Sequence, residues 1–441
     1  LIIFIFAMNF KIIVMKTQSF FALVFTVFLF ASCSKTESVS QCYHENLFVY
    51  DNSPEHNIVY RIPAIATTSN GNIIAVSDYR DCGADIGFGL VSLHYKVSHD
   101  NGKTWGEEKI LAQGHEGKYG LGEDNDLEAG FGDAAVVADR ESSKVLILSC
   151  CGNVSYPDAT FSHHQGIARF YSTDNGETFS NYEDISGAIY DMFKETGIDL
   201  ASMFVGSGRI FQSKTVKLGE YYRIYAACLL RTQIERGLNY VIYSDDFGQN
   251  WNILGHTATP AVTGGDEPKV EELPNGDILI SSRTAGRIFN IFKFSKEKEG
   301  NGEWMNQAVS NKENNGIIEE GNECNGEIMI LPVVRNSDQK KMYLALQSVP
   351  RGPEVRINVG IFYKELETAE DYASPEAFAK DWDGFYLCSE LPSAYSTMTL
   401  QKNNLLGFLY EETTFGPAYT IVYKSLSLET ITNNSYSLCL R

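Results

Sequence analysis

Three octapeptides repeat one arrangement of residues that could do acid–base chemistry. SHDNGKTW at 98–105, STDNGETF at 172–179 and SDDFGQNW at 244–251 share Ser, Asp, Gly and an aromatic residue at fixed positions. A positioned aspartate can act as a general acid or base. An Asp followed two residues later by Gly is also typical of a tight turn, in which the carboxylate accepts backbone hydrogen bonds and the Gly adopts a positive φ. We therefore predict that the octapeptides are hairpin turns and that the chemistry lies elsewhere.

The sequence contains no recognisable pattern of metal ligands. Its nine Cys show no CxxC spacing, and the adjacent Cys150 and Cys151 cannot easily bind one metal. The segment GEDNDLE at 122–128 lacks the ligand spacing of a calcium loop. No Gly-rich phosphate loop followed by Lys-Ser or Lys-Thr occurs. We expect neither a metal nor a cofactor.

The composition is that of a folded acidic protein. The chain has 441 residues, of which 44% are hydrophobic, and a net charge of −20. A nucleic acid is therefore a poor partner for the surface as a whole. A small anionic ligand would need a local cluster of Arg side chains in a cleft, where a low dielectric strengthens a few fixed charges.

The N-terminal residues have the composition of an export signal. From Met15, the segment MKTQSFFALVFTVFLFASC places a Lys before an apolar run and small residues directly before Cys33. The apolar run is shorter than the roughly 20 residues of a membrane-spanning helix. We expect residues 1–33 to be an export segment cleaved before Cys33, with lipid on its sulfur, and residues 34–44 to be a tether. The residues before Met15 are interpreted as an over-long reading frame.

Short β-type runs fill the chain from about residue 45 to its end. Gly, Asn and Asp separate runs such as KVLILSC, NYVIYS and DILISS, and only 187–197 and 374–384 have a helical pattern. The octapeptides recur at intervals of 74 and 72 residues, and a degraded copy lies at 295–304. Repetition at an interval of several strands is typical of a propeller or solenoid. We predict one all-β domain over residues 45–441.

The octapeptides are Asp boxes, and the segments between and after them resemble the sialidase (neuraminidase) family of glycoside hydrolases. The resemblance extends from YRIPAI at 60–65 to LYEE at 409–412 and includes SDYRDCGADIG, EPKVEELPNGDILISSR, VPRGPEVRINVGIFY and LPSAYSTMTL in the family's order. Asp boxes also occur in unrelated propellers, so this ordered set is the more specific signal. The resemblance implies a six-bladed β-propeller.

By resemblance, three arginines bind the carboxylate of the sugar: Arg61, Arg283 and Arg356. Planar guanidinium groups bind carboxylates with paired hydrogen bonds and stay charged at every physiological pH. Arg351 is a nearby rival of Arg356 and fits a solvated loop position better. A substrate bound in this way carries a carboxylate on its reacting ring carbon.

The resemblance also implies the nucleophile and its base. Tyr395 in LPSAYSTMTL would be the nucleophile, and Glu267 would take its proton. A carboxylate nucleophile would be repelled by the substrate's own carboxylate, whereas a neutral phenol would not, and sialidases are the known Tyr-nucleophile exception among glycosidases.

The general acid is assigned by its distance from an arginine. In SDYRDCGADIG, Arg80 is itself expected to bind the substrate, and it is followed five residues later by Asp85, as in the family loop. Asp78 and Asp81 lie close by. Two further acids have supporting roles by resemblance. Glu411 would orient Arg61, and Asp133 would line the pocket, although a strand-entry turn is an equally good interpretation of Asp133.

The sequence therefore predicts a retaining exo-sialidase that hydrolyses terminal α-linked sialic acids of glycoproteins, glycolipids and oligosaccharides. We expect a monomer exported to the envelope of a Gram-negative bacterium. Two alternatives stay open. The same residues would serve a trans-sialidase or an intramolecular trans-sialidase, and a non-catalytic Asp-box propeller could bind glycans.

Overall fold

The computed structural model describes residues 42–51, 58–320 and 323–439. The residues from Ser40 to Arg441 form one compact unit. The predicted export segment 1–33 and most of the predicted tether 34–44 lie outside the described residues, so both stay predictions.

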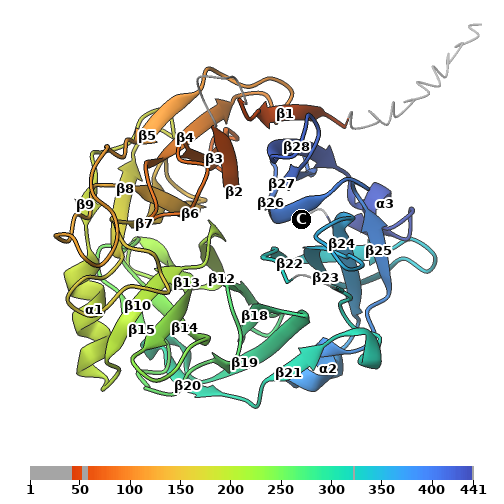
Figure 1. The fold of residues 1–441 in the computed structure, drawn as a ribbon. Helices are drawn as coiled ribbons and strands as arrows, with labels where there is room; N and C mark the ends of the chain where they lie inside the picture. The colour runs from red at the N-terminus through yellow and green to blue at the C-terminus, as the bar shows by residue number, and fades with distance from the viewer. Residues whose placement is uncertain (1–41, 52–57, 321–322, 440–441) are drawn as a thin grey trace, which may run out of the picture. The chain divides into compact units, whose positions relative to one another are not determined.

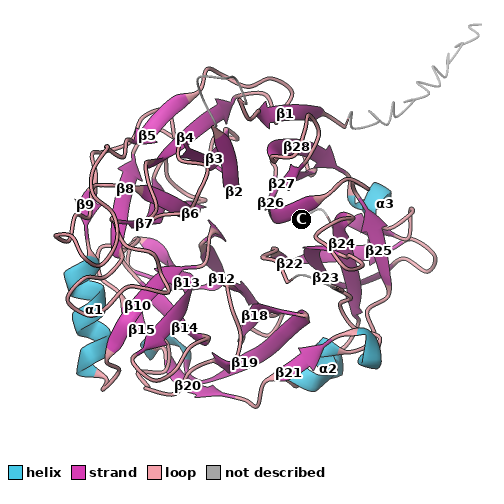
Figure 2. Ribbon diagram, viewed as in Figure 1, coloured by secondary structure: helices cyan, strands magenta, loops and turns pink. Residues whose placement is uncertain are grey.

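Six β-sheets surround a central axis and form a six-bladed β-propeller, as the sequence predicted (Figures 1 and 2). The first sheet contains β2 (Val59–Thr67), β3 (Ile73–Arg80), β4 (Val91–Ser98) and β5 (Lys109–Ala112). The second contains β6 (Phe131–Ala138), β7 (Val145–Cys151), β8 (Gly166–Ser172), β9 (Glu183–Asp184) and β11 (Gly208–Arg209). The third contains β10 (Leu200–Val205), β12 (Phe211–Leu218), β13 (Tyr221–Thr232), β14 (Leu238–Ser244), β15 (Asn252–Ile253) and β16 (Val262–Thr263).

The other three sheets complete the ring. The fourth contains β17 (Pro268–Glu272), β18 (Ile278–Thr284), β19 (Gly286–Lys296), β20 (Asn301–Trp304) and β21 (Ala308–Ser310). The fifth contains β22 (Ile328–Arg335), β23 (Lys340–Pro350), β24 (Val359–Leu366), β25 (Gly384–Leu387) and β29 (Tyr436–Leu438). The sixth contains β26 (Ser393–Leu400), β27 (Leu406–Glu412), β28 (Thr420–Leu426) and β1 (His44–Phe48), so an N-terminal strand closes the last blade.

The hydrophobic cores lie between neighbouring blades. One cluster joins Leu146 of β7 to Ile224 of β13, and another joins Ile65 of β2 to Leu409 of β27. A sheet that packs against neighbours on both faces needs apolar residues on both, which explains near-continuous apolar runs such as VLILSCC in β7.

The octapeptides are turns between the third and fourth strands of their blades, as predicted. In the first one, Gly102 N donates to Ser98 Oγ (2.9 Å) and Thr104 N donates to Asp100 Oδ1 (2.8 Å). Asp174 and Asp246 accept the equivalent bonds at 3.0 and 2.9 Å. The degraded copy is also a turn, formed by η1 (Glu297–Glu299) between β19 and β20.

Besides η1, five short helices lie outside the sheets in the part of the chain that the structure describes. The helix α1 (Ser186–Glu195) matches its prediction, whereas α2 (Pro375–Ala379) is shorter than predicted because the backbone is extended at Lys380. The helix α3 (Leu428–Ile431) was not predicted. The 3₁₀ helices η2 (Lys312–Asn314) and η3 (Ala369–Tyr372) lie in connections. No helix in the described ranges is long and apolar enough to cross a membrane.

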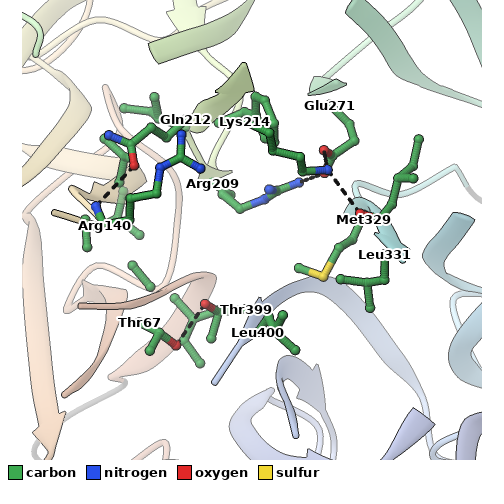
Figure 3. A pocket seen from close by; sticks show the side chains of 18 residues that line it. Thr67, Arg140, Arg209, Gln212, Lys214, Glu271, Met329, Leu331, Thr399 and Leu400 are labelled. Atoms are coloured by element: carbon green, nitrogen blue, oxygen red, sulfur yellow. Dashed lines mark hydrogen bonds and ion pairs between the residues drawn. The ribbon is translucent and has the colours of Figure 1, made fainter. Parts of the chain in front are cut away.

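The two ends of the innermost strands carry different groups. A cavity of about 330 Å³ lies at their C-terminal ends, among Thr67, Arg209, Lys214, Glu271 and Thr399 (Figure 3). Three of its charged groups are paired with one another: Glu271 accepts from Arg209 at 2.8 Å and from Lys214 at 2.9 Å. Of the residues predicted for catalysis, Glu267 and Tyr395 lie at or near the N-terminal ends of innermost strands, and Asp85 lies in the connection between β3 and β4.

Asp100→Ala is expected to destabilise the fold without impairing the chemistry. The substitution removes the acceptor of Thr104 N and of the Ser98 and Thr104 hydroxyls, which should lower the free energy of unfolding by about 1–2 kcal/mol. Urea unfolding measures the change, with Lys103→Ala in the same turn as the control. A fully folded Asp100→Ala protein that has lost turnover would contradict the turn assignment.

Candidate active site

Three innermost strands bring predicted residues together at one end of the propeller. Arg61 is the third residue of β2, Tyr395 is the third residue of β26, and Glu267 directly precedes β17. The innermost strands of a propeller run in the same direction, so residues near their starts meet at one mouth of the central channel.

A hydrogen bond joins the predicted nucleophile to its predicted base. Tyr395 Oη donates to Glu267 Oε1 at 2.5 Å, and the other carboxylate oxygen accepts from Arg283 Nη1 at 2.6 Å. Arg283 Nη1 also lies 3.3 Å from Tyr395 Oη. Residues 267 and 283 come together because the antiparallel pairing of β17 and β18 continues here, with Arg283 N donating to Glu267 O at 3.1 Å.

Burial and the charge of Glu267 raise the pKa of Tyr395 well above its usual range, while Arg283 opposes the shift. The phenol therefore stays protonated in the free protein. It can attack an electrophile only as its proton passes to a base, and the hydrogen bond to Glu267 provides that path.

The two other predicted arginines flank the ring of Tyr395. The guanidinium carbon of Arg61 lies 5.6 Å from the ring centroid, and that of Arg356 lies 5.9 Å from it. Arg356 is oriented by the carbonyl of Glu323, which accepts from Nη2 at 2.6 Å and from Nε at 3.1 Å. The rival Arg351 lies over the ring of Phe385 in β25 instead.

Glu411 holds Arg61 in place. Its carboxylate is fully buried and accepts from Arg61 Nε (2.9 Å), from Ile62 N (2.7 Å) and from Tyr395 N (3.2 Å). Burial lowers the pKa of Arg61, but the adjacent Glu411 carboxylate outweighs it and raises that pKa. Arg61 therefore presents a permanent positive charge in the site.

Asp85 lies in the connection between β3 and β4 with 57% of its side chain exposed. Its Oδ1 lies 3.1 Å from Arg80 Nη2 and accepts from Ile86 N at 2.8 Å. Arg80 also donates to Asp78, at 2.8 Å from Nη2. The spacing of five residues thus places Asp85 against Arg80, whereas Asp78 is buried behind that arginine.

Asp133 lies next to Asp78 in the second blade. It lies in an irregular part of β6 with φ at +54°, and its N–H donates to Asp78 Oδ1 at 2.9 Å. Burial and the negative charges of Asp85 and Asp78 raise its pKa well above the usual range, despite Arg80. Its carboxyl is thus within electrostatic reach of the predicted acid.

Two residues of the site were not found from the sequence. The ring centroid of Tyr419 lies 5.0 Å from the guanidinium carbon of Arg61, and nothing in the sequence distinguishes this residue among 24 Tyr. Asp266 lies 3.5 Å from Arg283 Nη1, and its position next to Glu267 was the available signal. Within the described ranges, no group of three or more His, Cys, Asp and Glu side chains could hold a metal ion.

No family model matches the chain. A sialidase of Micromonospora viridifaciens is 29% identical over 242 residues, which cover 52% of this chain and 33% of that protein. A sialidase of Paraclostridium sordellii is 24% identical over 317 residues, which cover 70% of this chain and 71% of that protein. The chain is therefore similar in sequence to sialidases over half or more of its length.

Solved structures of a sialidase and of an intramolecular trans-sialidase resemble this chain at the level of the fold. The intramolecular trans-sialidase from Ruminococcus gnavus, in complex with oseltamivir carboxylate, superposes with a TM-score of 0.65 at 15% sequence identity. The match covers 87% of this chain and 98% of that one. The chain spans a third of the length of the Micromonospora sialidase.

Asp133→Asn is expected to change how stability depends on pH. A pKa raised in the folded state means that the folded protein binds more protons than the unfolded chain, so the free energy of unfolding falls as pH rises above about 4. Asn tolerates the positive φ and removes this contribution. The variant should gain stability relative to the wild type between pH 4.5 and 8, as measured by urea unfolding.

Asp174→Asn is the matched control for this measurement. Partial burial raises the pKa of Asp174, but hydrogen bonds from Thr178 outweigh it and lower that pKa. The control should therefore be destabilised by a constant amount over the same pH range. If the free energies of unfolding of Asp133→Asn and the wild type change with pH in parallel, the raised pKa of Asp133 is contradicted.

Proposed function

We propose that the protein is an exo-sialidase that hydrolyses terminal α-linked sialic acids with retention of configuration. The observation that carries the proposal is the hydrogen bond between Tyr395 and Glu267, flanked by the guanidinium groups of Arg61, Arg283 and Arg356. The sialidases among its relatives support the same reaction class.

The three arginines select the substrate. Each is already oriented by an acceptor of the protein: Glu411 for Arg61, Glu267 for Arg283, and the Glu323 carbonyl for Arg356. A carboxylate on the reacting carbon can accept hydrogen bonds from their remaining N–H groups. This requirement excludes neutral sugars and places the anomeric carbon of a sialic acid near Tyr395.

The first step transfers the sugar to the enzyme. Tyr395 Oη forms a bond to the anomeric carbon while the bond from that carbon to the leaving oxygen breaks. The phenolic proton passes to Glu267, and Asp85 gives its proton to the leaving oxygen. A neutral phenol approaches an anionic sugar without the repulsion that a carboxylate nucleophile would meet.

The second step releases the sugar. Asp85, now ionised, takes a proton from water as the water oxygen bonds to the anomeric carbon and the Tyr395–sugar bond breaks. Glu267 returns its proton to Tyr395. Two displacements at the same carbon give retention, and both carboxyl groups recover their starting protonation states.

The product identifies the reaction. The purified protein is incubated with an aryl α-sialoside and with 3′-sialyllactose, and the products are separated and identified. Free sialic acid is expected. A transferred sialic acid would indicate a trans-sialidase, and an anhydro sugar would indicate intramolecular transfer. No release from either substrate would contradict an enzymatic role and favour a glycan-binding propeller.

Tyr395→Phe is expected to abolish covalent labelling by a fluorinated sialosyl donor, because the phenolic oxygen is the atom that bonds to the sugar. Intact-mass measurement detects the adduct in the wild type. Tyr410→Phe is the matched control, since Tyr410 lies on the neighbouring strand β27 with its side chain in the core between the fifth and sixth blades. Labelling that persists in Tyr395→Phe would move the nucleophile to another residue.

A further inference from the structure

A buried carboxylate lies directly behind the predicted acid. Asp78 is 0% exposed and precedes Arg80 by two residues in β3. Side chains two residues apart in a strand lie on the same face, so Asp78 and Arg80 both face the site. Asp78 Oδ2 accepts from Arg80 Nη2 at 2.8 Å and from Arg80 Nε at 3.2 Å.

The same nitrogen of Arg80 serves two carboxylates. Nη2 lies 2.8 Å from Asp78 Oδ2 and 3.1 Å from Asp85 Oδ1. The side chain of Arg80 is 5% exposed, whereas that of Asp85 is 57% exposed. The position of the exposed acid thus depends on a buried arginine, and the orientation of that arginine depends on Asp78.

Asp78 is itself held from the neighbouring blade. Its Oδ1 accepts from Asp133 N in β6 at 2.9 Å. It also packs against Gly132, since a Cβ built there would lie 2.9 Å from Asp78 Oδ2 and 2.9 Å from Ile86 Cδ1. These contacts leave the carboxyl group little freedom to rotate, and they place Ile86, the neighbour of Asp85, in the same packed group.

The arrangement is electrostatically unfavourable for Asp78. Burial raises the pKa of Asp78 to about 7, although Arg80 beside it favours the ionised form. Asp85 adds a further negative charge, and Asp133 is close enough to be affected by both. A buried carboxyl group in such surroundings adds little to stability, and groups of this kind are concentrated at functional sites.

We propose that Asp78 is a positioning residue, which orients Arg80 so that Arg80 fixes Asp85 where it can protonate the leaving oxygen. This inference rests on the acid role proposed for Asp85 above. The effect of Asp78 should therefore depend on how much the leaving group needs a proton.

Two substrates separate a loss of acid catalysis from a general defect. Nitrophenolate leaves a sialoside without protonation, whereas the sugar alkoxide of 3′-sialyllactose requires a proton. In Asp78→Asn, kcat for 3′-sialyllactose is expected to fall about 10²-fold or more, and kcat for the nitrophenyl sialoside less than about tenfold. An equal loss on both substrates, as a purely structural residue would give, would overturn the proposal.

Asp245→Asn is the matched control variant. Asp245 directly follows β14 and lies in an octapeptide turn. Its carboxylate accepts from the buried Arg223 at 2.6 and 2.9 Å. Its loss should lower the melting temperature without changing the ratio of the two kcat values. A changed ratio in this control would show that the ratio reports stability, which would also overturn the proposal.

A crystal structure gives a readout that is independent of activity. In Asp78→Asn the contact between Arg80 Nη2 and Asp85 Oδ1 is expected to be lost, and a retained contact would overturn the proposal. If wild-type protein cleaves neither substrate, the proposed function fails while this structural test still decides the role of Asp78.

If Asp78→Asn does not fold, Arg80→Lys replaces it as the test variant. The single ammonium group of Lys lacks the planar fork that serves both carboxylates. An unchanged ratio of the two kcat values in Arg80→Lys would overturn the proposal.

Discussion

The candidate site depends on the buried carboxylate of Glu411. An isolated charge in a protein interior is highly unfavourable, and Glu411 is tolerated because three donors surround it. Two of them, Arg61 Nε and Ile62 N, belong to the first blade, and the third, Tyr395 N, belongs to the sixth. One side chain therefore sets the spacing between the first predicted arginine and the predicted nucleophile across the seam where the ring closes. Ile62 adopts a φ of +56°, which is rare for a β-branched residue, and its N–H is bound by this carboxylate.

Other acceptors around the site orient guanidinium groups as Glu411 orients Arg61. A chain with a net charge of −20 presents a cluster of guanidinium groups, and each is held by an acidic or carbonyl oxygen of the protein. These acceptors neutralise part of the positive charge, but they fix the direction of each planar fork before a ligand arrives. An oriented donor loses less conformational entropy on binding than a free side chain does. The acids therefore contribute to recognition of an anion through geometry, although their charge opposes it.

Much of the fold was predictable because its signals are local. The octapeptides specify hairpin turns through residues within eight positions, and apolar runs such as VLILSCC specify buried strands. The resemblance favours Arg356 over Arg351, and in the structure Arg356 lies beside the ring of Tyr395 whereas Arg351 lies over Phe385 on the outer strand β25. The pairing of β1 with β28 was not predicted, because nothing in HENLF indicates which distant edge it joins. The helix α3 is too short to show a periodic pattern. The contact of Asp78 with Arg80 could have been inferred from their spacing of two residues in one strand.

Closure by β1 has a consequence for synthesis. Tyr43 N donates to Ser425 Oγ across 382 residues of sequence, so the last blade cannot be completed until β28 has left the ribosome. At about 5–20 residues per second, this takes roughly 20–80 s after β1 is made. During that interval both β1 and the first blade lack their partners, and an unpaired strand edge is prone to wrong association. The order of synthesis therefore delays completion of the site, since Arg61 is synthesised 350 residues before its partner Glu411.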